Sequence, residues 1–203
     1  MPERSKARVR RTRERSQEEI LEAGAAVLEE GGFAALTVRD VMARTEVGRS
    51  TFYLYFSGIP DLVVAILEEL VGELFSAAEP WLDAGGTRGA DGIAQAISNV
   101  VSVWATRGRL LGALVEASRS AQMVGDAWDQ QLMEPFVRAI SQVIRTESSL
   151  PIPDADELAR ALIRMNEAYL VDTFGTGRRK VSAKAAATTL TTIWTRALYD
   201  AAN

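Results

Sequence analysis

The stretch Thr37–Phe56 reads TVRDVMARTEVGRSTFYLYF, and it decides the fold of the first part of this 203-residue chain. Thr37 is suited to cap the N-terminus of a helix, and Asp40 is suited to the first turn of that helix. Apolar residues follow at spacings of three and four, which predicts a short amphipathic helix. The segment TEVG at 45–48 then breaks the pattern, and its glycine accepts the backbone angles of a turn.

A second helix is predicted from Arg49 to Phe56, directly after this turn. Phe52 and Phe56 lie four residues apart and are expected to face inward. Two short helices joined by a glycine-containing turn form a helix-turn-helix, in which the second helix reads DNA. The side chains left for its outer surface are Arg49, Ser50, Thr51, Tyr53 and Tyr55.

These outer side chains suit the major groove of DNA. An arginine pairs with guanine or phosphate, and short serine and threonine side chains let the helix approach closely. Tyrosine hydroxyls suit phosphate oxygens, which fix the register of the protein on DNA but do not read sequence. The alternative is an ordinary surface helix with two spare aromatics, and the pattern alone leaves it open.

The same stretch and its surroundings resemble the DNA-binding domain of the TetR family of bacterial repressors. The resemblance covers residues 16–75 and includes a helix over Ser16–Glu30, the turn GGF at 31–33 and the ending FYLYF. It implies a three-helix DNA-binding domain, a linker helix, and a helical domain for ligand binding and dimerisation. By this resemblance Tyr53 contacts phosphate, Arg49, Thr51 and Tyr55 face the DNA, and Thr37 and Arg39 touch the DNA backbone or groove edge.

Three positions depart from the family pattern. Serine is common where Gly48 stands, so the second helix is expected to lack a side-chain cap. Leu54 occupies a place where a polar or aromatic residue is usual, and it either contacts a thymine methyl group or packs against the protein. The family's Pro-Ser-Lys after Phe56 is Ser-Gly-Ile here, which puts its lysine–phosphate contact in question.

The N-terminal segment is basic, although the whole chain has a net charge of −4. Residues 1–15 carry seven basic and two acidic side chains, a net charge of +5, so the other 188 residues sum to −9. A basic block before an acidic body predicts a flexible DNA-binding arm over residues 1–15. The alternative is a solvated terminus that adds only non-specific attraction. The arm residues expected to bind DNA are Arg8, Arg10, Arg11 and Arg13.

The residue inventory argues against an enzyme, a metal site and a membrane protein. The chain has no histidine and no cysteine, so it lacks the commonest general base, disulfides and thiolate metal ligands. We therefore predict no catalytic residue, no metal ligand and no cofactor. No apolar run of about 18 residues occurs, and glutamates interrupt any export segment. These features fit a cytoplasmic protein, and the resemblance implies a bacterial one that is associated with the nucleoid when it is bound to an operator.

The remainder predicts an all-α protein with a second helical domain. The expected boundaries are 16–60 for the helix-turn-helix domain, about 60–75 for the linker helix and 76–203 for the ligand-binding and dimerisation domain. Gly108 is expected to end a helix, and Pro135 is expected to kink or divide one. Helices are predicted over Asp91–Thr106, Leu110–Ser118, Met123–Glu147, Asp154–Phe174 and Ser182–Ala201.

Aromatic residues recur once or twice in each helix of this second domain. Either they fill the core and Asn166 bonds a neighbouring helix, or they converge on a cavity in which Asn166 bonds a ligand carbonyl. The runs ALIRMNEAYLVDTF at 161–174 and TTLTTIWTRALY at 188–199 resemble the EthR branch of the family. That branch has an aromatic-lined tunnel for lipophilic molecules, with a second amide where this chain has Ile163. The residues expected to bind ligand are Trp104, Trp128, Met133, Phe136, Asn166, Leu170 and Trp194.

Small residues on the last predicted helix allow another helix to approach closely, and the resemblance implies a homodimer through the last two helices. Two-fold symmetry then demands a palindromic operator. The leading hypothesis is a repressor whose binding to double-stranded operator DNA is modulated by a lipophilic small-molecule effector. The alternative is an orphan helix-turn-helix protein with a filled core and no effector.

Overall fold

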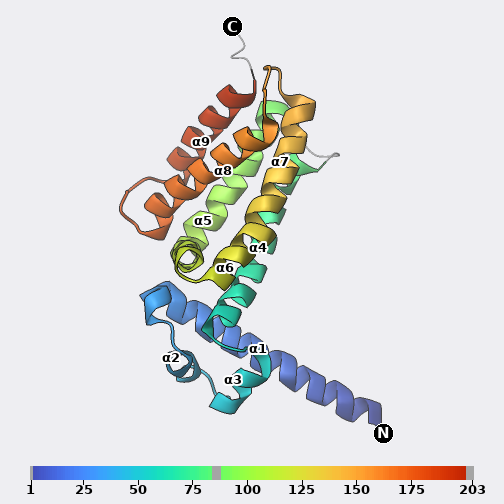
Figure 1. Cartoon of the computed structure of the whole chain (residues 1–203), viewed down its shortest axis with the longest axis vertical. Coiled ribbons are helices and arrows are strands. Elements are labelled where there is room, and N and C mark those ends of the chain that lie inside the picture. The colour runs from blue at the N-terminus through green and yellow to red at the C-terminus, as the bar shows by residue number, and fades with distance from the viewer. Residues whose placement is uncertain (1, 84–87, 200–203) are drawn as a thin grey trace.

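The computed structural model describes residues 2–83 and 88–199, with side chains from residue 13 onward. Every regular element in this part of the chain is a helix, which confirms the all-α prediction. Figure 1 shows a small head at the N-terminal end and a longer helical body, joined by one helix that runs through both. Among the described residues, no helix combines the length and apolarity needed to cross a membrane.

The head consists of α1 (Pro2–Gly31), η1 (Phe33–Ala35), α2 (Val38–Met42) and α3 (Arg49–Tyr55). Its core is apolar, with Ile20 and Leu28 of α1, Val41 of α2 and Phe52 of α3 all fully buried. Helix α1 begins at Pro2, well before the start expected at residue 16. Residues 3–15 contain no proline or glycine and are mostly good helix formers, so the helix continues through them.

Helix α4 (Ile59–Leu82) connects the head to the body. A β-carbon at Gly24 of α1 would lie 2.8 Å from a methyl carbon of Leu62, so the glycine lets α1 and α4 approach closely. The linker helix predicted to end near residue 75 continues to Leu82, with Pro80 in its last turn. The head and the body therefore share one continuous helix.

The body consists of α5 (Gly89–Ser120), α6 (Gln122–Ala127), η2 (Trp128–Met133), α7 (Glu134–Glu147), α8 (Ala155–Leu170), η3 (Val171–Gly175) and α9 (Ala183–Leu198). Helix α5 packs against α4 and α9, and α7 packs against α8. Pro135, expected to kink or divide a helix, lies in the first turn of α7, which begins at Glu134 without a loop before it. The residues before it form a π-helical segment, η2.

The helix break predicted at Gly108 is wrong. Gly108 lies inside the continuous helix α5, and a β-carbon there would come within 2.6 Å of the β-carbon of Phe174 and 2.8 Å of its backbone. The glycine therefore serves the close approach of α5 and η3. An isolated glycine in a sequence does not reveal which of these two roles it has.

At the end of the body far from the head, three contacts meet at the carboxylate of Glu147. This carboxylate pairs with Arg88, accepts the backbone N–H of Gly89 at 3.1 Å and accepts the hydroxyl of Tyr199 at 3.1 Å. Burial and this hydrogen bond raise the pKa of Tyr199 to about 12. The cluster ties together the start of α5 and the ends of α7 and α9.

Candidate DNA-binding face and ligand cavity

Polar contacts fix the position of α2 in the head. The hydroxyl of Thr37 accepts the backbone N–H of Asp40 at 3.2 Å, so Thr37 caps α2 as predicted. The same hydroxyl donates to the Asp40 carboxylate and lowers the pKa of that group. Arg44 donates two hydrogen bonds to Glu30 of α1, at 2.8 and 2.6 Å, and lowers the pKa of this glutamate.

Helix α3 is held against the rest of the head by its phenylalanines. Phe52 and Phe56 are buried, with ring centroids 5.5 Å apart, as the sequence predicted. Gly48 precedes the helix and supplies no side-chain cap, which is also as expected. The helix therefore depends on packing for its position, since a glycine cannot satisfy its first N–H groups with a side chain.

The opposite surface of α3 is open. Arg49 and Ser50 are exposed, Tyr53 is 54% exposed, and Thr51 is half-buried. On α2, the Arg39 side chain is 84% exposed and pairs only with its neighbour Asp40. Arg39, Arg49, Ser50 and Tyr53, four of the residues predicted to contact DNA, are thus exposed at the surface of the head.

Tyr55 has a different setting from the other predicted DNA contacts. Its ring is half-buried beside Phe56, and its hydroxyl donates to the backbone carbonyl of Arg13 at 3.0 Å. This bond joins α3 to α1 and gives Tyr55 a role in positioning the helix. The Arg13 side chain is exposed, whereas the side chains of Arg8, Arg10 and Arg11 lie outside the described residues.

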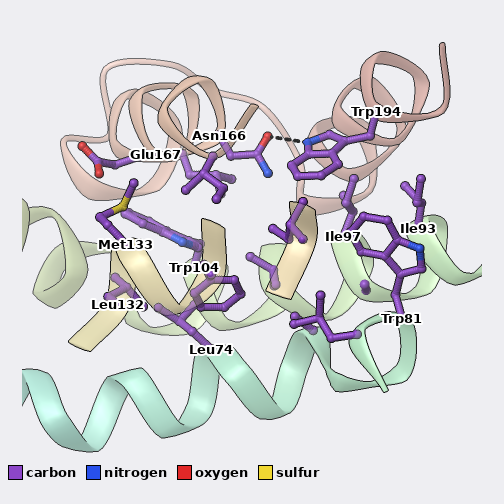
Figure 2. Close-up of a pocket in the computed structure, with 18 of the residues that line it drawn as sticks. Leu74, Trp81, Ile93, Ile97, Trp104, Leu132, Met133, Asn166, Glu167 and Trp194 are labelled. Carbon is purple, nitrogen blue, oxygen red and sulfur yellow. Dashed lines mark hydrogen bonds between the residues drawn. The ribbon is translucent and has the colours of Figure 1, made fainter. Parts of the chain in front are cut away.

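A cavity of about 110 Å³ lies inside the body. Its walls are almost entirely apolar and come from α4, α5, η2, α7, α8 and α9 (Figure 2). All the residues predicted to bind ligand line it: Trp104, Trp128, Met133, Phe136, Asn166, Leu170 and Trp194. The structure therefore brings the predicted set together, while its use by a ligand stays a prediction.

Asn166 supplies a polar group in this apolar wall. Its amide oxygen accepts the indole N–H of Trp194 at 3.0 Å. Because an indole nitrogen can only donate, this bond fixes which end of the amide is the oxygen. The amide nitrogen then lies on the cavity side, as Figure 2 shows, with two N–H groups to offer. Asn166 thus bonds a neighbouring helix and also presents donors to the cavity, while its bond to a ligand carbonyl stays a prediction.

The aromatic side chains pack in pairs around the cavity. Phe75 and Phe136 are stacked with ring centroids 4.0 Å apart, and Trp81 meets Trp194 edge to face at 5.7 Å. Such pairs add about 0.5–1.5 kcal/mol beyond the burial of their area. These two contacts link α4 to α7 and to α9 beside the cavity.

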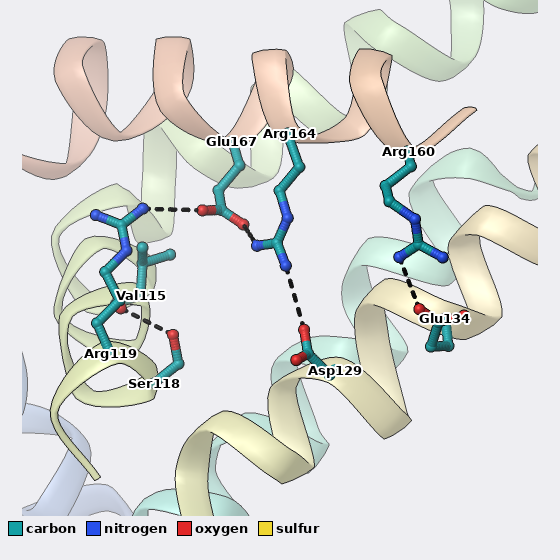
Figure 3. A network of polar contacts seen from close by, with 8 residues as sticks. All are labelled: Val115, Ser118, Arg119, Asp129, Glu134, Arg160, Arg164 and Glu167. Atoms are coloured by element: carbon teal, nitrogen blue, oxygen red, sulfur yellow. Dashed lines mark hydrogen bonds and ion pairs between the residues drawn. The ribbon is translucent and has the colours of Figure 1, made fainter. Parts of the chain in front are cut away.

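Ion pairs join neighbouring helices on the outer side of the cavity wall. Glu167 is a buried carboxylate that pairs with Arg119 at 3.1 Å and Arg164 at 3.1 Å, and Arg164 also pairs with Asp129 of η2 at 3.2 Å (Figure 3). Figure 2 shows the Glu167 carboxylate turned away from the other lining residues. The charges are thus kept at the margin, and the Asn166 amide presents a polar group to the cavity.

A further ion pair joins α8 to α7. Arg160 donates to Glu134 at 2.7 Å, and this hydrogen bond holds the pKa of Glu134 below its usual value. Both partners are substantially exposed, so the pair contributes little to stability by itself. Among the described residues there is no group of three or more acidic side chains that could hold a metal ion.

Some residues that line the cavity were not among those predicted to bind ligand. Trp81 lines the cavity from α4, beyond the expected end of the linker helix, and Ile93 and Ile97 line it from α5. The two isoleucines are four residues apart, which marks a buried helix face but does not distinguish a cavity wall from a filled core.

Comparison with known proteins identifies the class of protein that this head and cavity define. Residues 93–200 match the family model described as the C-terminal domain of the transcriptional regulator EthR. Residues 20–66 match the model of bacterial regulatory proteins of the tetR family. The chain therefore belongs to the TetR family of bacterial transcriptional regulators, with an EthR-type C-terminal domain, and it is a regulator and not an enzyme.

Individual relatives agree with this assignment. The chain is 24% identical over 184 residues to the HTH-type transcriptional regulator EthR of Mycolicibacterium smegmatis, covering 89% of this chain and 84% of that protein. A transcriptional regulator from Rhodococcus sp. RHA1 has the same fold, with a TM-score of 0.74, 19% identity and coverage of 90% and 95%. A TetR-like regulator from the same organism gives a TM-score of 0.71, 18% identity and coverage of 89% and 94%.

Proposed function

We propose that this regulator binds a palindromic operator as a homodimer and that a small lipophilic molecule in the body cavity modulates its affinity for DNA. The observation that carries the proposal is the sharing of α4. The first turns of this helix pack against α1 of the head, and its second half supplies Leu74, Ala78 and Trp81 to the cavity wall. A ligand that changes the position of α4 therefore changes the position of the head.

A second link runs through η2. This segment supplies Trp128 and Met133 to the cavity, and Gln131 on its other side donates to Glu68 of α4 at 3.3 Å. Only the width of η2 thus separates ligand contacts on its cavity side from its hydrogen bond to α4 on the other side. A ligand shifts the equilibrium between two head positions only by its difference in affinity for them, so these contacts have to differ between the two states.

The proposed homodimer uses α8 and α9. The exposed face of α9 carries small residues such as Ala185, Thr188 and Thr192, and it also exposes Ile193, which is unusual for a large apolar side chain. Pairing of this face with a second copy would bury Ile193 and place two α3 helices on one side of the dimer. The basic arm adds phosphate contacts, and the regulator would act in the bacterial cytoplasm, at the nucleoid.

DNA binding is tested by selecting bound duplexes from a random pool. We expect the wild-type protein to enrich a palindrome with half-sites about one helical turn apart. Tyr53→Phe is expected to weaken binding about equally to all enriched duplexes, because it removes a phosphate contact. Arg49→Ala is expected to weaken binding by about 1–3 kcal/mol and also to alter the preferred base at one position in each half-site. Enrichment of no sequence would contradict the proposal.

The cavity predicts the chemistry of the effector. A neutral molecule with an apolar chain and one carbonyl group fits, because the wall is apolar and the Asn166 amide offers hydrogen-bond donors. A carboxylate does not fit, because no cation lines the cavity among the described residues. Probes of this class are 2-hexanone and, as a matched molecule without the carbonyl, 1-hexene.

Asn166→Leu separates the hydrogen bond from the apolar contacts. We expect the variant to bind 2-hexanone about tenfold more weakly than the wild type, since one hydrogen bond contributes about 1 kcal/mol or slightly more. Binding of 1-hexene is expected to stay within about twofold of the wild type. The change in tryptophan fluorescence measures both, because Trp81, Trp104, Trp128 and Trp194 all line the site. Equal losses for both probes would show that the amide only supports the wall.

A further inference from the structure

The outermost ridge of α3 is formed by Ser50 and Leu54. Successive residues of an α-helix are rotated by about 100°, so Leu54 and Ser50 lie about 200° and 160° around the axis from Phe52. The exposed fractions agree with this geometry. Phe52 is 0% exposed and faces the core, whereas Leu54 is 74% exposed and faces directly away from it. Arg49 and Tyr53 lie on one flank of the ridge.

The sequence left two roles for Leu54, and the structure excludes packing against the protein. Leu54 is the most exposed of the large hydrophobic side chains in the described part of the chain, and it does not pack on the core cluster. Its neighbour on the ridge, Ser50, is short and exposed, so Leu54 is the larger side chain of this ridge. In a helix that enters a groove, the ridge opposite the protein core goes deepest, to the edges of the bases.

An apolar side chain at this depth has one suitable partner. Covering a donor or acceptor on a base edge with leucine would remove its water without replacing the hydrogen bond, which is costly. The thymine 5-methyl group is the apolar feature that the major groove displays, and it distinguishes a T·A pair from the others. The flanking residues Arg49 and Tyr53 are polar and suit guanine or phosphate, so they do not compete for this group.

We infer that Leu54 is a specificity-determining residue that contacts the 5-methyl group of one thymine in each operator half-site. The inference rests on the proposed binding of DNA through α3 and goes beyond it by naming the base and the atom that the outermost residue reads. A leucine at this place favours a thymine and disfavours a cytosine, whose amino group would lose its hydrogen bonds under an apolar side chain.

Exchange of thymine for deoxyuridine tests this contact. In an operator enriched by the wild-type protein, each thymine of one half-site is replaced in turn, which removes only the methyl group. At one position we expect the wild-type Kd to rise about fourfold, which corresponds to about 0.8 kcal/mol for one buried methyl group. The Leu54→Ala protein should bind the thymine and deoxyuridine duplexes of that position equally, within about 1.5-fold, and Leu54→Met should retain most of the difference.

The outcomes separate this inference from the function on which it rests. Failure of the wild type to enrich any duplex would overturn both. An enriched operator with no methyl-sensitive position, or a methyl-sensitive position to which Leu54→Ala responds as the wild type does, would overturn the role of Leu54 and leave DNA binding intact. Because Leu54 is exposed, its substitution should not affect folding, and equal melting temperatures of the variants and the wild type verify this point.

Discussion

Replacement of Phe52 by alanine is expected to lower the free energy of unfolding of the head by about 3–5 kcal/mol. The ring is fully buried among α1, α2 and α3, and it also contacts Phe56. Its removal leaves a cavity, and the short helices around it can fill this cavity only by moving from their native positions. Since α3 has no side-chain cap, this packing is its main support, and DNA binding should be lost with it.

Urea unfolding followed by circular dichroism measures this effect. The exposed neighbour Leu54 provides the matched control, because Leu54→Ala should change the free energy of unfolding by less than about 0.5 kcal/mol. A loss below about 1 kcal/mol for Phe52→Ala would mean that α3 does not pack as the structure shows.

Two glycines in long helices predict opposite effects of the same substitution. Gly108→Ala on α5 is expected to destabilise the protein by about 1–3 kcal/mol, because its β-carbon would lie 2.6–2.8 Å from Phe174 side-chain and backbone atoms. Gly72→Ala on α4 is expected to stabilise it by up to about 1 kcal/mol. A β-carbon at Gly72 meets nothing within 4 Å, so there the higher helix propensity of alanine acts without hindrance.

Thermal unfolding of the two variants in parallel provides the measurement. Both substitutions lower the entropy of the unfolded chain, because each replaces a glycine. This common effect cancels when the stabilities of the two variants are compared with each other. Stabilisation by both alanines would show that α5 and η3 are not in close contact, and the explanation given for the wrong helix break at Gly108 would then fail.

The head could be predicted in detail because its signals are local. The Thr37 cap, the buried pair Phe52 and Phe56, and the uncapped helix after Gly48 follow from residues within four positions of one another. Capping and helical periodicity act at that range, so tertiary contacts had little to override. The hydrogen bond from Tyr55 to the carbonyl of Arg13 spans 42 residues and was beyond such reasoning.

The body was harder to predict because its signals are long-range. Gly108 resembles a helix breaker until Phe174 is placed against it, and the π-helical form of η2 has no distinct pattern in the sequence. Whether the aromatics enclose space or fill it also depends on how helices distant in the sequence meet. The resemblance to the EthR branch supplied the cavity residues that periodicity alone could not select.

In the proposed mechanism, occupation of the body cavity changes the affinity of the head for DNA. An equilibrium titration of a fluorescent enriched operator with the wild-type protein, without and with saturating 2-hexanone, measures this change. We expect Kd to change by about fivefold or more in one direction, with a smaller change at the same ketone concentration for Asn166→Leu. An identical Kd for the wild-type protein with and without bound 2-hexanone would contradict it.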